Sequence, residues 1–287
     1  MPDNATIATL PDSQGHKHRA DVQLNQPQCD STKPNEIRLS LLAPNATKPS
    51  AVEPNAIKHE SVVAEQKQKV FIIGLPRTGT TSVSVALLEQ GLKVAHMAFT
   101  KQAFMLADAV SDTPCFSDYQ QLDLLFPEAV FVYLDRDINT WLPSMQMLLG
   151  KMAPHLDEKT GRFHPILKRS FRHTFAIDKV AEPASSEHLI ACYQKHQQEV
   201  FAYFNGREDF ISIDVSHAGS LSQLLQFLGI EANAKNSDVT LGLSEPLSFP
   251  KLNVGRNVAS WGEYKHPNKV NTNSAGPQSR KFFDYTL

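Results

Sequence analysis

The segment from Gly74 to Thr81 contains residues whose types and spacing suit the binding of an oxyanion. The apolar residues 70–73 predict a buried strand that leads into this segment, and the residues after it predict a helix. Gly74 and Gly79 allow a tight turn, so that successive N–H groups can point at one ligand beside the positive end of the helix. We therefore predict a phosphate or sulfate site here.

The spacing of this loop is that of a P-loop, G-x-x-x-x-G-[K]-[ST], with Thr80 at the lysine position. An enzyme that hydrolyses ATP or GTP normally needs that lysine on the β- and γ-phosphates. The only cation within the loop is Arg77. A P-loop kinase or NTPase with a degenerate Walker A loop remains an alternative, because residues 130–135 also fit a Walker B strand and Thr81 could reach Mg²⁺.

A second apolar run, residues 130–134, predicts a buried parallel strand that lies beside the first. It ends in Asp135-Arg136-Asp137, before a predicted helix over 138–150. Strand ends of this kind bind ligands in open α/β sheets, and a guanidinium group can donate to two phosphate oxygens at once. Arg136 is therefore a candidate phosphate ligand.

The loop pattern G-x-P-R-[ST]-G-T-T resembles the 5′-phosphosulfate loop of the sulfotransferases that use 3′-phosphoadenylyl sulfate (PAPS). Arg136 and Ser144 resemble the pair with which that family binds the 3′-phosphate, and the resemblance extends over most of residues 70–254. Ser82 departs from the hormone-type enzymes, which have a tryptophan there to stack on adenine. The resemblance implies PAPS as donor substrate, PAP as product, and these donor-binding residues: Pro76, Arg77, Thr78, Gly79, Thr80, Thr81, Arg136, Ser144 and, from a basic C-terminal loop, Arg256.

The same resemblance implies sulfuryl transfer to a hydroxyl or amine of a small-molecule acceptor, with no metal required. Arg77 would stabilise the charge that develops on the bridging oxygen of the leaving nucleotide. A base must accept the proton of the acceptor. Asp112 lies near the position where related enzymes have an acidic base, and His96 titrates near neutrality; the sequence leaves both open.

Alternating strands and helices after Phe71 predict an α/β fold of the three-layer P-loop NTPase type, with a central parallel sheet flanked by helices. We expect this domain to span residues 69–287 and its aromatic C-terminal end to pack back onto it. Residues 1–68 contain no Phe, Trp or Tyr and predict a disordered polar tail. The expected strands are 70–74, 92–95, 130–134 and 210–214, and the expected helices are 79–90, 99–110, 118–126, 138–150, 187–205 and 218–228, with helical pieces within 165–181 and a loop over 150–165.

Composition limits the partners and the location. The formal net charge of −2 argues against a nucleic-acid partner, and the chain has neither a signal-peptide pattern nor an 18-residue apolar run. We therefore predict a cytoplasmic protein without a membrane partner. The three cysteines show no metal-binding spacing. The identity of the acceptor and the oligomeric state stay open, and a non-catalytic nucleotide-binding module is a further alternative.

Overall fold

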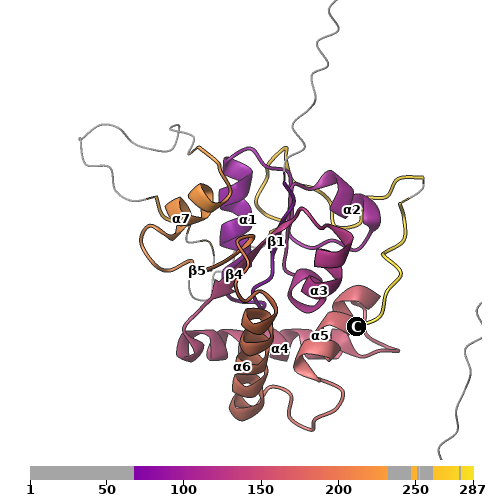
Figure 1. Cartoon of the computed structure of the whole chain (residues 1–287). Helices are drawn as coiled ribbons and strands as arrows, with labels where there is room; N and C mark the ends of the chain where they lie inside the picture. Colours follow the sequence, from indigo (N-terminus) through magenta and orange to yellow (C-terminus); the bar gives the residue numbers. More distant parts are fainter. Residues whose placement is uncertain (1–67, 232–246, 251, 253–260, 278) are drawn as a thin grey trace, which may run out of the picture. The chain divides into compact units, whose positions relative to one another are not determined.

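The computed structural model describes residues 68–231, 247–250, 252, 261–277 and 279–287, all of which belong to the unit Ser61–Leu287. Strands and helices alternate through the first half of this unit (Figure 1). In chain order the elements are β1 (Val70–Ile72), α1 (Thr80–Glu89), β2 (Val94–Ala95), α2 (Lys101–Leu106), β3 (Ala109–Ser111), α3 (Cys115–Leu125), β4 (Val130–Asp135), α4 (Ile138–Leu156), α5 (Pro165–Phe175), α6 (Ser186–Tyr203), β5 (Phe210–Asp214) and α7 (Ser220–Phe227).

The described strands form one five-stranded parallel sheet in the order β2-β3-β1-β4-β5. β1 is central, and Val70 lies opposite Ala109 of β3 and Val130 of β4. The prediction that strand 130–134 lies beside the first is therefore confirmed. The chain leaves β1 toward β2 and leaves β4 toward β5, in opposite directions across the sheet. Ligands of open α/β sheets bind at the carboxyl ends of strands where the connections diverge in this way.

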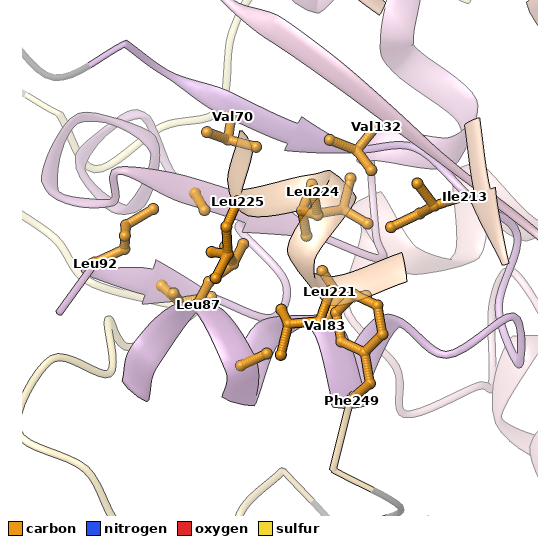
Figure 2. Packing of buried hydrophobic residues seen from close by; sticks show 14 of the residues in the cluster. Val70, Val83, Leu87, Leu92, Val132, Ile213, Leu221, Leu224, Leu225 and Phe249 are labelled. Carbon is orange, nitrogen blue, oxygen red and sulfur yellow. The ribbon is translucent and has the colours of Figure 1, made fainter. Parts of the chain in front are cut away.

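Helices cover both faces of the sheet. Successive side chains of a strand point to opposite faces, so each strand contributes to two cores. Val70 and Ile72 belong to a core that β1 shares with α1 and α7, whereas Phe71 belongs to a core with α2, α3 and α6. The predicted three-layer α/β fold is thus confirmed. Figure 2 shows the first core, in which Val83, Leu87, Leu221, Leu224 and Leu225 of the two helices surround Val70, Val132 and Ile213 of the strands.

A third core connects α4, α5 and the first half of α6. Its largest side chain, Trp141 of α4, is fully buried. Leu75, from the loop after β1, belongs to the same core and is also fully buried. Burial of one leucine side chain contributes about 1.5–3 kcal/mol, so this contact ties the loop to the helices beneath it.

Several predicted elements differ from the observed bounds; the helix expected over 118–126, for example, begins at Cys115. The helix expected over 99–110 ends at Leu106, and residues 109–111 form the strand β3, which the sequence analysis missed. The expected loop over 150–165 begins late, because α4 continues to Leu156. Leu149 and Leu156 are both buried, and their packing extends the helix through Gly150.

The C-terminal segment packs against the domain, as predicted. Val94 of β2 donates its N–H to Asn268 O and accepts from the N–H of Val270, at 3.0 and 2.8 Å. Farther on, Phe283 meets Phe104 edge to face, with ring centroids 5.2 Å apart. Among the helices of the described residues, none is both long enough and apolar enough to cross a membrane.

Candidate active site

The loop between β1 and α1 passes so close to its neighbours that two of its positions accept only glycine. A Cβ atom at Gly74 would lie 2.6 Å from Leu134 Cβ of the adjacent strand. Gly79 has φ +111°, and a Cβ atom there would lie 2.5 Å from Cγ2 of Val215. These two approaches explain in physical terms why the sequence has glycine at both ends of the loop.

Internal hydrogen bonds fix the shape of the loop. The buried Thr78 hydroxyl donates to Leu75 O at 2.7 Å. The indole Nε1–H of Trp141 donates to Pro76 O at 2.9 Å. Since these groups bond within the protein, the Thr78 side chain and the Pro76 carbonyl contribute to the shape of the loop, and the side chains of Arg77, Thr80 and Thr81 define its chemistry.

Arg77, Arg136 and Ser144 meet at the carboxyl ends of β1 and β4. Arg77 Nε donates to Ser144 Oγ at 2.8 Å, and Arg136 Nη1 donates to Arg77 O at 2.5 Å. Arg136 Nε also donates to Thr140 Oγ1 at 3.3 Å. The structure therefore brings both predicted arginines and the predicted serine into one constellation.

The surroundings of Arg77 disfavour its charged form. Burial is the larger cause that lowers the pKa of Arg77, the neighbouring Arg136 lowers it further, and Asp112 opposes them. An arginine remains protonated nonetheless. Its backbone is also in the left-handed region, with φ +73°, which is uncommon outside glycine. An anion at this point would favour the charged form of Arg77.

Asp135, the carboxylate that would complete a Walker B strand, is engaged by α6. Its Oδ1 accepts from Tyr193 OH at 2.9 Å and from Gln197 Nε2 at 3.1 Å, and also from the N–H of Arg136 at 3.0 Å. These contacts give Asp135 a positioning role for Arg136, which the sequence analysis did not foresee.

The two candidate bases lie side by side at the start of α1. His96 Nε2 and Asp112 Oδ2 are 3.7 Å apart. Each is next to a loop threonine: Thr80 Oγ1 donates to Asp112 Oδ2 at 3.3 Å, and Thr81 Oγ1 is 3.3 Å from His96 Nε2. Burial is the main cause that lowers the pKa of His96, with a smaller effect of Lys269, while Asp112 raises it. His96 is thus neutral near pH 7 and can accept a proton.

Residues outside the predicted set surround His96. Ser111 of β3 and Ser84 of α1 contact the Nδ1 side of the His96 ring. The ring centroids of Trp261 and His96 are 5.2 Å apart. Lys269 Nζ lies 4.4 Å from the centroid of Trp261. Ser84 could have been noticed as a serine on the buried face of the predicted helix. Ser111 lies in a strand that the sequence analysis did not predict.

Arg256, the predicted C-terminal ligand, lies outside the described residues. A surface hollow of about 600 Å³ lies elsewhere, among α3, α5 and α6, and none of the predicted site residues lines it. The convergent cations and hydroxyls at the loop identify the candidate site better than the size of that hollow. The walls of the hollow, away from the candidate site, include Tyr119, His173, Lys195 and Glu199.

Comparison with known proteins agrees with an anion-binding loop in this part of the chain. A family model described as a sulfotransferase domain matches residues 69–103 and 98–258 of the chain. The chain is also similar to Ava biosynthesis cluster protein M of Aspergillus versicolor, with 31% identity over 111 residues. That match covers 28% of this chain and 43% of the relative, so the chain spans less than half of the relative's length.

Proposed function

Because the chain belongs to the sulfotransferase family, we propose that it transfers a sulfuryl group from PAPS to a hydroxyl or amine of a small-molecule acceptor. The observation that carries the proposal is the meeting of Arg77, Arg136 and Ser144 at the ends of two adjacent strands. PAPS would supply an activated sulfuryl group in a mixed phosphate–sulfate anhydride. Two nearby guanidinium groups and a glycine-bounded loop suit a ligand with several anionic groups.

In this proposal each part of the site has one task. The loop N–H groups, including that of Thr80, and the hydroxyl of Thr81 bind sulfuryl and 5′-phosphate oxygens at the positive end of α1, while the Thr80 hydroxyl donates to Asp112. Arg77 stabilises the charge that develops on the bridging oxygen, and a bound anion would, like Asp112, offset the burial of the guanidinium. Arg136 binds the 3′-phosphate with Ser144, and Arg256 is proposed as an additional ligand.

Two groups can accept the proton of the acceptor. His96 is buried and neutral near pH 7, and its Nε2 lies at the first turn of α1, beside Thr81. Asp112 has φ +59° and also lies at that turn, beside Thr80. We propose His96 as the base and Asp112 as the group that stabilises the imidazolium once formed, since an opposite charge favours the protonated ring.

The kinase alternative is less well supported. A Mg²⁺-dependent enzyme needs a free carboxylate at the end of the second strand and a lysine in the loop. Thr80 stands at the lysine position, and Oδ1 of Asp135 already accepts hydrogen bonds from Tyr193 and Gln197.

Thermal-shift measurements test the donor, because a ligand that binds only the folded state raises the melting temperature. We expect PAP and PAPS to stabilise the protein more than ATP with Mg²⁺ does. Arg136→Ala should weaken PAP binding by about 1.5–3 kcal/mol, the range for a hydrogen bond to a charged group. Lys195→Ala is the matched control, since it removes one positive charge from the exposed pair with Glu199 on α6. Stronger stabilisation by ATP with Mg²⁺, together with nucleotide hydrolysis, would reject the proposal.

Assays with radiolabelled PAPS and a panel of phenols, alcohols and amines then test the base. His96→Asn should lower turnover by about 10²–10⁴-fold, the usual contribution of general-base catalysis, and leave PAP affinity unchanged. Asp112→Asn should lower turnover less. A larger loss with Asp112→Asn than with His96→Asn would assign the base to Asp112 instead.

A further inference from the structure

Two buried serines contact the side of His96 that faces away from the loop. Ser111 Oγ lies 2.9 Å from His96 Nδ1, and Ser84 Oγ lies 3.3 Å from the same nitrogen. The two serine oxygens are 2.7 Å apart. Both serines are fully buried, so bulk water does not compete for these bonds.

Each hydroxyl has a single proton, and counting these protons gives the network a direction. Ser84 Oγ lies 2.7 Å from Thr80 O, the carbonyl one helical turn earlier, which can only accept. The Ser84 proton is used in that bond, so the Ser111 proton bonds to Ser84 Oγ. The remaining lone pairs of both serines face His96, whose Nδ1 must then carry a proton.

We propose that Ser84 and Ser111 are positioning residues that hold neutral His96 in the tautomer with the proton on Nδ1 and the lone pair on Nε2. This inference rests on the proposed function, since it assigns the two serines a task in preparing the base of that reaction. Nε2 is the nitrogen that lies beside Thr81 and Asp112, at 3.3 and 3.7 Å. Asp112 Oδ2 is beyond hydrogen-bond distance of Nε2, so the serine contacts on the Nδ1 side set the tautomer, and the lone pair points to the side of the ring where the loop lies.

The consequence for proton transfer is specific. When the acceptor O–H bond breaks, its proton goes to Nε2 and the ring becomes an imidazolium. The Nδ1–H bonds to the serines are kept throughout, so the ring neither flips nor exchanges a proton on its buried side. Oriented groups of this kind fix the tautomer of a catalytic or metal-binding histidine in other sites.

Nitrogen NMR of the full-length protein tests the tautomer without any activity measurement. Two-bond ¹H–¹⁵N correlation spectra of ¹⁵N-histidine protein distinguish protonated from bare ring nitrogens, and the His96 signals are those lost in His96→Asn. We expect Nδ1 protonated and Nε2 bare in the wild-type protein at neutral pH. A wild-type spectrum with Nδ1 bare would overturn the proposal, and this result needs no folded variant.

Substitutions test whether the serines cause the tautomer. Ser111→Ala should shift His96 toward the Nε2–H form, seen as movement of both nitrogen signals toward each other. Ser111→Thr keeps the hydroxyl and should leave the wild-type spectrum unchanged. Ser84→Ala is the second variant, and it should act in the same direction. An unchanged spectrum in Ser111→Ala and Ser84→Ala would reject the role of the serines. Failure of PAP to bind would instead reject the proposed function and leave the tautomer result intact.

Discussion

Replacement of Gly79 by alanine probes the closest approach in the candidate site. The new Cβ atom would lie 2.5 Å from Cγ2 and 3.1 Å from Cγ1 of Val215, so rotation of that β-branched side chain cannot clear both contacts. We expect an overpacking cost of about 1–3 kcal/mol. The φ of +111° adds about 1–2 kcal/mol, the penalty for a left-handed backbone in a residue with a Cβ atom. Gly79→Ala should therefore lower the free energy of unfolding by about 2–5 kcal/mol, the sum of these two terms.

A double-mutant cycle separates the two terms. Val215 is partly buried against the α1–α7 core, so Val215→Ala alone should cost about 1 kcal/mol for its two methyl groups. In Gly79→Ala/Val215→Ala the overlap is gone and only the backbone term and the lost methyls remain. The double variant should thus be about 1–3 kcal/mol more stable than the sum of the single changes predicts.

Urea denaturation of the four proteins measures the cycle, and PAP affinity measured on the same samples reports the loop. We expect PAP affinity to fall in Gly79→Ala and to recover in part in the double variant. Strict additivity of the two changes would refute the argument that Val215 is what excludes a side chain at this position.

Three further changes test contacts away from the loop backbone. Trp141→Phe removes the indole donor to Pro76 O while it keeps an aromatic ring in the core. Because a buried carbonyl loses its partner, the free energy of unfolding measured in urea should fall by about 1–3 kcal/mol, and PAP binding should weaken. Lys168→Met removes an ammonium group that donates to three backbone carbonyls within residues 157–161; limited proteolysis should then cut this segment faster than in Lys195→Ala. Burial lowers the pKa of His196 to about 4 from its ordinary value of 6.5, so the unfolded chain binds a proton that the folded one excludes between these values. The stability present above pH 6.5 should decrease by about 3 kcal/mol as the pH falls toward 4, and urea titrations of His196→Gln should show a smaller slope in that window.

The sequence was sufficient to predict the elements that combine strong local signals with burial. The glycine-bounded loop and the two apolar strands next to it were predicted because continuous apolar runs of this kind occur in parallel sheets. The loop and strand ends pointed to Arg77 and Arg136, and the resemblance to the sulfotransferases pointed to Ser144; the structure brings the three together. Their assigned contacts with the donor remain predictions.

The missed elements depend on tertiary packing. The segment 109–111 is short and its side chains are small, and it forms a strand because β1 and β2 pair with it on both sides. Helix α4 passes Gly150 because Leu149 and Leu156 are buried in the third core. The missed serine Ser111 lies in that undetected strand, so its contact with His96 had no signal in the sequence.

The first turn of α1 joins the two halves of the proposed reaction. Thr80 lies beside Asp112, Thr81 lies beside His96, and the same turn presents its N–H groups at the loop. Among the described residues other than glycine, a positive φ occurs at Arg77, at Asp112 and at the end of α5. Strain of this kind persists only where the surroundings enforce it, and here two of its three occurrences flank that turn. The proposed donor site and both candidate proton acceptors therefore contact one short piece of backbone, and a change that moves the start of α1 should alter both.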